Sequence, residues 1–210
     1  MQIYIGIDPS INSTGLCIQV FNNDKRIYEH FYIIKPDKLT KKEQKAQEEN
    51  EIFDYIIYNK YDLSAYKNEN HLYEYYKTLK MICLIESISN VIFDEIEKFI
   101  GEKQLLIYAV IEGISYGSST RTKSVFDLAG LNYLIRYKML KHHHFNDFII
   151  VPPSELKKFI TGKGNVTKEV IIDFFTALYP TLNIPKIDDI ADAYFMSLYA
   201  KHIKNKCSIL

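Results

Sequence analysis

Two carboxylate residues end the two most apolar segments of the chain. Asp8 follows the run "IYIGI", and Glu112 closes the run "LLIYAVIE". In an open α/β sheet, ligands bind at the carboxyl ends of the strands. An unpaired buried carboxylate is costly, so each of these acids needs either water or a cation beside it. The two positions therefore predict a polar site at one edge of a sheet.

A third group of acids opens the last predicted helix, at Asp188, Asp189 and Asp192. Asp189 and Asp192 are three residues apart, which puts both on one helical face. Carboxylates gathered in one place repel one another unless divalent cations neutralise them, and such oxygen ligands suit Mg²⁺ or Mn²⁺. Two ions held in this way can activate water and stabilise the leaving oxygen of a phosphodiester. The pattern predicts a metal-dependent nuclease.

Each acid taken alone also has a structural interpretation. A single aspartate at a strand end is usually a turn residue, and Asp188 could serve only as the N-cap of its helix. The combination favours the functional interpretation, because acids end two apolar strands and a further pair opens a helix.

The elements that would position these acids follow from the hydrophobic pattern. Period-two and continuous apolar runs predict strands at 3–8, 14–21, 26–34, 105–112 and 148–152. Helical spacing predicts helices at 81–100, 124–140, 155–160, 167–178 and 188–204. We expect an α/β fold with a mixed five-stranded sheet, in which three antiparallel strands precede parallel ones and helices flank the sheet. Residues 35–80, rich in lysines, acids and tyrosines, are expected to form a mostly helical insertion.

Composition limits the class of protein. The 210 residues suit a single domain, 1–210, and the 26 basic residues balance the 26 acidic ones. Zero net charge gives no global argument for a nucleic-acid or membrane partner. The three scattered cysteines, the missing signal-peptide pattern and the lack of a membrane-spanning apolar run predict a soluble, intracellular, cytoplasmic protein.

Positive charge is concentrated locally. From residue 115 to residue 169, nine lysines and arginines stand against four acids, which is the kind of patch that phosphate contacts require. Within it, "TGKGN" places Lys163 between two glycines ahead of a helix, where main-chain amides could bind a phosphate. Alone, that segment is more often a turn between helices.

Four motifs in order resemble those of the RuvC-type Holliday junction resolvases, which have the ribonuclease H-like fold, and especially their phage and viral relatives. The motifs are "GIDPSINSTG" (6–15), "IEGISYGSS" (111–119), "VPPSELKKFITGKGNVTK" (151–168) and "DDIADA" (188–193). They span nearly the whole chain apart from the 35–80 insertion, which is longer than in bacterial members. The resemblance implies a homodimer that cuts four-way or other branched DNA junctions with two Mg²⁺ ions, for which Mn²⁺ can substitute, in a bacterial or a phage- or virus-infected cell.

The resemblance also assigns roles to residues. The metal-binding acids of the family fall on Asp8, Glu112, Asp189 and Asp192, and its two functional lysines fall on Lys157 and Lys168. We expect Lys168 to support the transition state. The family's junction-centre aromatic residue falls on Ser115, with Tyr116 beside it as a substitute. The remaining candidates for DNA contact are Lys158, Lys163, Arg121 and Lys123.

Other functional classes stay open from the sequence. An actin-like ATPase or sugar kinase also begins with a strand, an aspartate and a turn, but it needs a second phosphate loop and two lobes. A non-catalytic nucleic-acid-binding relative predicts the loss of at least one acid, and all four are present. A ribonuclease, or a nuclease acting broadly on branched DNA, is the nearest alternative.

Overall fold

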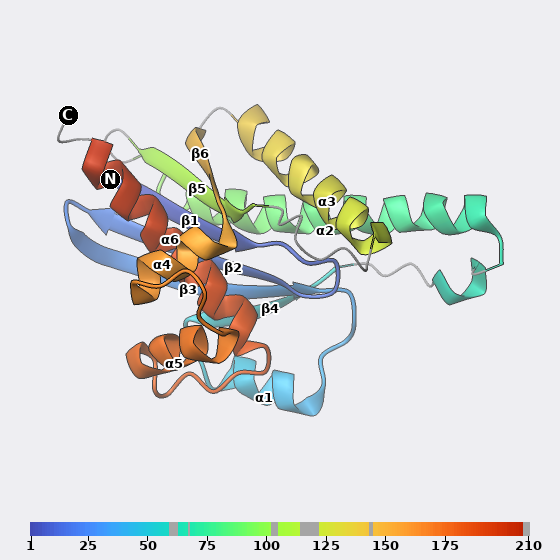
Figure 1. Cartoon of the computed structure of the whole chain (residues 1–210), viewed down its shortest axis with the longest axis horizontal. Helices are drawn as coiled ribbons and strands as arrows, with labels where there is room; N and C mark the ends of the chain where they lie inside the picture. The colour runs from blue at the N-terminus through green and yellow to red at the C-terminus, as the bar shows by residue number, and fades with distance from the viewer. Residues whose placement is uncertain (59–62, 67, 102–104, 114–121, 143–144, 208–210) are drawn as a thin grey trace.

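A mixed sheet runs through the middle of the protein, with helices on both of its faces (Figure 1). The computed structural model describes residues 1–58, 63–66, 68–101, 105–113, 122–142 and 145–207. The strands are β1 (Gln2–Asp8), β2 (Thr14–Asn22), β3 (Lys25–Lys35), β4 (Phe53–Ile57), β5 (Leu106–Glu112) and β6 (Phe145–Val151). The helices are α1 (Lys41–Glu48), α2 (Asn70–Glu97), α3 (Thr122–Lys141), α4 (Pro153–Thr161), α5 (Lys168–Leu178) and α6 (Ile187–Cys207), and Leu63–Tyr66 forms a 3-10 turn.

The strand order is β4-β3-β2-β1-β5-β6. β2 is antiparallel to both β1 and β3, whereas β5 is parallel to β1, β6 to β5 and β4 to β3. The predicted α/β class and the antiparallel start followed by parallel strands are therefore confirmed. Because β2 alone runs in the opposite direction, the carboxyl ends of β1, β3, β4, β5 and β6 share one edge of the sheet.

The sheet has six strands rather than the predicted five, because β4 lies inside the segment expected to be mostly helical. Phe53 and Tyr55 are buried while Asp54 and Ile56 are half-buried, which is the alternation of an edge strand. β4 has only five residues, so the helix-forming lysines and glutamates around it dominate any longer sequence window. The first part of 35–80 is accordingly α1 followed by β4, and α2 begins at Asn70 instead of near residue 81.

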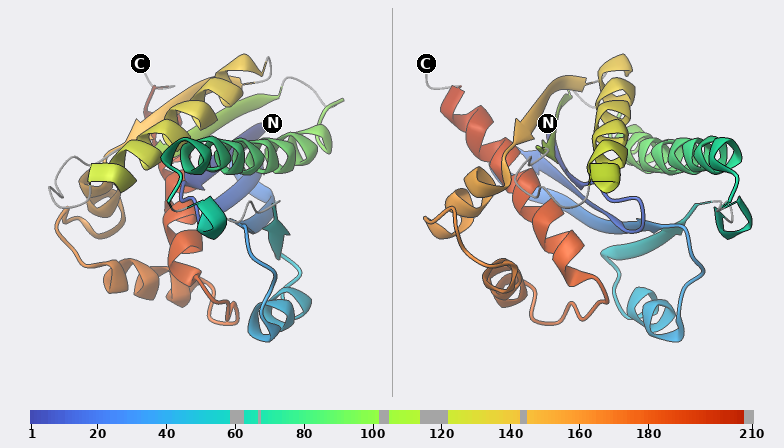
Figure 2. Two further views of the ribbon diagram at one scale, coloured as in Figure 1. Left: turned by 90° about the vertical axis from the view of Figure 1, so that its right-hand side faces the viewer. Right: turned by 45° about the vertical axis from the view of Figure 1, so that its right-hand side comes forward.

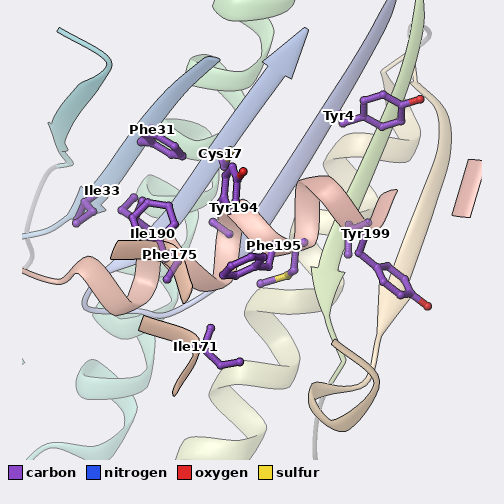
Figure 3. Packing of buried hydrophobic residues seen from close by; sticks show 14 of the residues in the cluster. Tyr4, Cys17, Phe31, Ile33, Ile171, Phe175, Ile190, Tyr194, Phe195 and Tyr199 are labelled. Atoms are coloured by element: carbon purple, nitrogen blue, oxygen red, sulfur yellow. The ribbon is translucent and has the colours of Figure 1, made fainter. Parts of the chain in front are cut away.

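Two hydrophobic cores lie on the two faces of the sheet. On one face Phe31 packs against Phe175 of α5 and Tyr194 of α6, and Tyr4 and Cys17 belong to the same buried cluster (Figure 3). The alternate residues of the same strands pack on the opposite face against α2 and α3, where Ile5, Ile18, Ile88 and Leu131 are all buried. Figure 2 shows α2 and α3 together on the side of the sheet away from α6.

Helix α6 approaches the sheet unusually closely, at two glycines. A Cβ placed on Gly6 of β1 would overlap the carbonyl oxygen of Ala193, and one placed on Gly15 of β2 would overlap that of Asp189. The main chain of α6 therefore lies directly on β1 and β2, and this contact fixes where the acids of its first turn stand.

No helix in the described part of the chain is long and apolar enough to cross a membrane.

Candidate active site

Asp8 and Glu112 are brought together by the register of two central strands. β1 and β5 pair in parallel with Ile7 opposite Ile111, so the next residue on each strand, Asp8 and Glu112, ends the pair at the same edge. Neighbouring strands are about 4.8 Å apart, which puts the two carboxylates within reach of a shared ligand. The structure thus places both acids at one edge of the sheet, as their positions at the ends of apolar strands predict.

The third source of acids is the start of α6. A turn precedes the helix. In this turn Lys186 has a left-handed backbone (φ 65°), and its carbonyl accepts a hydrogen bond from the Asp189 amide. Asp189 is buried and accepts a hydrogen bond from the Ser13 hydroxyl in the loop between β1 and β2. Asp192, one turn further along, faces the same cavity as Asp8 and Glu112.

A cavity of about 690 Å³ opens at this edge of the sheet. Its polar wall holds three of the predicted acids and two of the predicted lysines, and its remaining walls come from the loop after β1 and from α3, α4 and α5. The charged lining residues are Asp8, Glu112, Asp192, Lys157 and Lys168. Asp189 does not line the cavity, because its carboxylate is turned toward Ser13.

Lys168, the first residue of α5, lies among the acids. Its ammonium group is 3.0 Å from Asp188 Oδ2 and 3.4 Å from Asp192 Oδ2. Burial alone would lower the pKa of Lys168, but the charges of Asp192, Asp188 and Asp8 outweigh it and raise the pKa. The lysine is therefore charged at neutral pH, and it partly neutralises the acidic wall.

The site holds more negative charge than it can neutralise. Burial is the main reason why the pKa of Asp8 is raised well above its ordinary value, with Asp192, Glu112 and Asp189 adding to the effect. Burial, followed by the charge of Asp192, raises the pKa of Glu112 to about 7. Burial likewise raises the pKa values of Asp189 and Asp192, against the opposing effects of Ser13 and Lys168. Carboxylates that resist ionisation together are a common feature of functional sites.

The donor set suits a hard divalent cation, since it consists of carboxylate oxygens that repel one another. Within the described residues, however, no three His, Cys, Asp or Glu side chains are grouped closely enough to hold an ion as they stand. Two of the acids already have other partners, because Lys168 stands beside Asp192 and Ser13 donates to Asp189. A cation bound by Asp192 would compete with the ammonium group of Lys168 for its carboxylate.

The raised pKa of Glu112 predicts how the stability of the metal-free protein depends on pH. The folded state keeps a proton that an unfolded glutamate, with a pKa near 4.5, has already lost. The relative stabilisation is therefore complete below pH 4.5 and is lost as the pH rises through about 7. We expect the free energy of unfolding in EDTA to fall across this window by an amount on the order of 3 kcal/mol.

Denaturant titrations at several pH values measure this slope, with Glu112→Gln as the comparison. The variant should keep a slope from Asp8 and Asp192 and lose the part that Glu112 contributes between pH 4.5 and about 7. Identical slopes for the two proteins would show that Glu112 is not held in this environment.

The predicted DNA-contact residues have different outcomes. Lys157 lines the cavity and donates to the carbonyl of Val166 (2.8 Å), so it also supports the loop between α4 and α5. Lys158 and Lys163 are exposed, and Lys163 follows Gly162, which ends α4 with a left-handed backbone (φ 79°). Tyr116 and Arg121 lie outside the described residues, and Lys123 belongs to α3 but its side chain is outside them as well.

Asp188, interpreted from the sequence as a possible N-cap, lies inside the first turn of α6 and accepts a hydrogen bond from Lys168. Burial alone would raise the pKa of Asp188, but the hydrogen bond and the charge of Lys168 lower it. Two residues at the site were not identified from the sequence, and the first is Ser13, which binds Asp189. Asn132, buried in α3, donates to the main-chain carbonyl of Glu112 (2.8 Å). A polar residue on the apolar face of a predicted helix is the signal that could have identified Asn132.

No protein-family model matches the sequence, and no curated protein matches it. The structure is similar to that of Thermus thermophilus RuvC, with a TM-score of 0.52 and 13% identity over 97% of this chain and 96% of that one. It is also similar to T. thermophilus RuvC in complex with a Holliday junction substrate, with a TM-score of 0.55 and 12% identity over 98% of this chain and 96% of that one. At this level of identity the likeness establishes the fold, and it confirms the predicted ribonuclease H-like architecture of the RuvC type.

Proposed function

We propose that the protein is a Mg²⁺-dependent, structure-specific endonuclease that cleaves four-way or other branched DNA junctions. The observation that carries this proposal is the cavity in which Asp8, Glu112 and Asp192 face Lys157 and Lys168, at the carboxyl edge of a RuvC-type sheet. A second acid of α6, Asp189, lies directly behind this wall and completes the proposed ligand set.

Asp8, Glu112, Asp189 and Asp192 would hold two Mg²⁺ ions, and such ions activate water and stabilise the leaving oxygen in phosphodiester hydrolysis. The protein itself positions the acids through the β1–β5 register and through the contact of α6 with Gly15. Lys168 is charged and sits on a rigid helix start, so once it leaves Asp192 it can stabilise negative charge on the scissile phosphate.

Substrate contact is proposed for the basic residues around the cavity. Lys157 reaches the wall itself, while Lys158 and Lys163 are exposed on α4 and on the turn that follows it. A DNA backbone entering the cavity between α3 and α4 would pass these cations, which contribute affinity without reading sequence. The geometry therefore favours recognition of DNA shape.

The proposal is tested with a labelled synthetic four-way junction, a fork and a linear duplex, each incubated with Mg²⁺ or with EDTA. We expect cleavage of the junction or the fork in Mg²⁺, much weaker cleavage of the duplex, and none in EDTA. Junction binding without cleavage would instead indicate a non-catalytic relative, and ATP hydrolysis without either would indicate the ATPase alternative.

A homodimer is also proposed, because α3 has an exposed apolar face. Phe126, Tyr133, Tyr137 and Leu140 are 75%, 61%, 57% and 69% exposed and follow one side of the helix. Exposed apolar stripes of this kind mark association surfaces. A dimer through α3 would supply two cavities for the two strands of a junction that must be cut.

The dimer is tested by analytical ultracentrifugation of the wild type and of Tyr137→Glu/Leu140→Glu. The charged variant should sediment as a monomer at concentrations at which the wild type is dimeric, because the carboxylates would be buried unpaired at the interface. Phe174→Glu, on α5 and 48% exposed, is the matched control and should leave the mass unchanged. A wild-type monomer at high micromolar concentration would contradict the dimer.

A further inference from the structure

Residues 36–58, which we call the α1–β4 extension, connect to the two segments that carry the acids. The extension follows β3, forms α1, and returns as β4 at the edge of the sheet. β4 runs in the same direction as β1, so its carboxyl end lies at the edge that carries Asp8 (Figure 1). Two tyrosines near this end donate hydrogen bonds to main-chain carbonyls outside the extension.

Tyr58 binds the loop that follows Asp8. Its hydroxyl donates to the carbonyl of Ile11 (2.6 Å), and its ring is buried at 3% exposure in the core under that loop. The Tyr58 amide donates to the carbonyl of Lys35 (3.1 Å), which continues the pairing of β4 with β3. Ile11 also lines the cavity, so this hydrogen bond fixes part of the cavity wall to the sheet.

Tyr55 binds the turn that precedes α6. Its hydroxyl donates to the carbonyl of Pro185 (3.2 Å), one residue before the left-handed Lys186. The Tyr55 amide is held by the side-chain oxygen of Gln47 in α1 (2.9 Å), so the residue is anchored within the extension. Ala46 of α1, Tyr55 and Ile184 of the turn are buried in the same hydrophobic core, so the hydrogen bond adds to apolar packing between the extension and the turn.

Both tyrosines remain hydroxyl donors under all physiological conditions. Burial is the main cause that raises the pKa of each phenol above its ordinary value, with nearby acids adding to it. Each acceptor carbonyl belongs to a short irregular segment that lacks the regular pairing of a strand or helix. Both hydrogen bonds are partly buried, so loss of a hydroxyl would remove a favourable contact of that segment and loosen it.

We propose that Tyr55 and Tyr58 are positioning residues of the nuclease site, through which the α1–β4 extension holds the loop after Asp8 and the turn before Asp189 in place for metal binding. This inference rests on the proposed function. Neither hydroxyl touches the cavity acids, so the effect of each passes through main-chain segments. The extension thereby acts on the site from the side of the sheet that ends in β4.

The test compares Tyr55→Phe, Tyr58→Phe and the double variant with Tyr28→Phe. The control loses a hydroxyl that donates to Glu95 (2.6 Å), and Glu95 keeps its bonds to Tyr32 and Lys98. Hydrogen exchange of peptides covering 9–14 and 183–189 reports the local structure without any need for activity, and residues 70–88 of α2, which precede Glu95 by two turns, serve as the internal reference. Mn²⁺ affinity measured by calorimetry reports the ligand geometry, and junction cleavage under single turnover reports the chemistry.

We expect Tyr55→Phe to raise amide exchange in 183–189 about fivefold and Tyr58→Phe to raise it about fivefold in 9–14. This is the factor that the loss of one net hydrogen bond supplies. Mn²⁺ binding and the cleavage rate should weaken several-fold in the double variant, while junction affinity and exchange in α2 stay as in Tyr28→Phe. Unchanged exchange and Mn²⁺ affinity in the double variant would overturn the inference. Failure of the wild type to cut any junction would instead overturn the proposed function, since exchange and Mn²⁺ binding are read independently.

Discussion

Asp8→Asn is expected to reduce junction cleavage by at least about a hundredfold, because the removed charge belongs to the ligand set that stabilises the transition state. The amide keeps the size of the side chain, and Asp8 follows five buried residues of β1. Junction affinity should change little, because phosphate contact is assigned to the lysines. Single-turnover cleavage and gel-shift titrations measure the two quantities separately.

The same substitution should have the opposite effect on stability. In the metal-free protein the Asp8 carboxylate is disfavoured by burial and by three neighbouring acids. Asp8→Asn removes this repulsion, so its melting temperature in EDTA at neutral pH should exceed that of the wild type, and saturating Mg²⁺ should stabilise the wild type more than the variant. A variant that cuts as fast as the wild type, or that is less stable in EDTA, would contradict the assigned role.

Gly15→Ala is expected to destabilise the protein strongly, by about 3 kcal/mol or more. The new Cβ would overlap the main-chain carbonyl of Asp189, and helix backbone cannot move aside as a flexible side chain can. Helix α6 would have to shift away from β2, which would displace Asp189 and Asp192 together. Cleavage should therefore fall even at temperatures at which the variant remains folded.

Gly130→Ala is the control for Gly15→Ala. Its Cβ would meet only the terminal methyl of Met81 at 3.4 Å, and Gly130 lies inside α3, where alanine favours the helix. We expect this variant to melt at or slightly above the wild-type temperature and to cut normally. Denaturation midpoints and cleavage rates of the two variants should diverge. Equal stability of the Gly15→Ala variant and the wild type would show that α6 is not seated on Gly15.

The parts of the site that the sequence predicts are those that depend on local pattern. Asp8 and Glu112 end apolar strands, and the parallel register that joins them follows from their places in an α/β sheet. Asp192 follows from helical spacing. By contrast, the pairing of Lys168 with Asp188 and Asp192 joins α5 to α6, and no periodicity specifies which cation meets which acid across two helices.

Other features could not be predicted because they depend on tertiary contact. β4 is too short for its alternating pattern to stand out from the polar residues around it, and only its pairing with β3 stabilises it as a strand. The need for glycine at position 15 arises from a helix more than 170 residues later in the chain. The bond from Ser13 that keeps Asp189 out of the cavity likewise joins positions 176 residues apart.

The central claim is that the acidic cavity binds the divalent ions that cut DNA. Anomalous diffraction from crystals of the wild-type protein grown with Mn²⁺ tests it most directly. We predict anomalous peaks between Asp8, Glu112 and the acids of α6, with the Lys168 ammonium moved away from Asp192. An ordered cavity without Mn²⁺, in which Lys168 still contacts Asp188 and Asp192 at saturating metal, would contradict the claim.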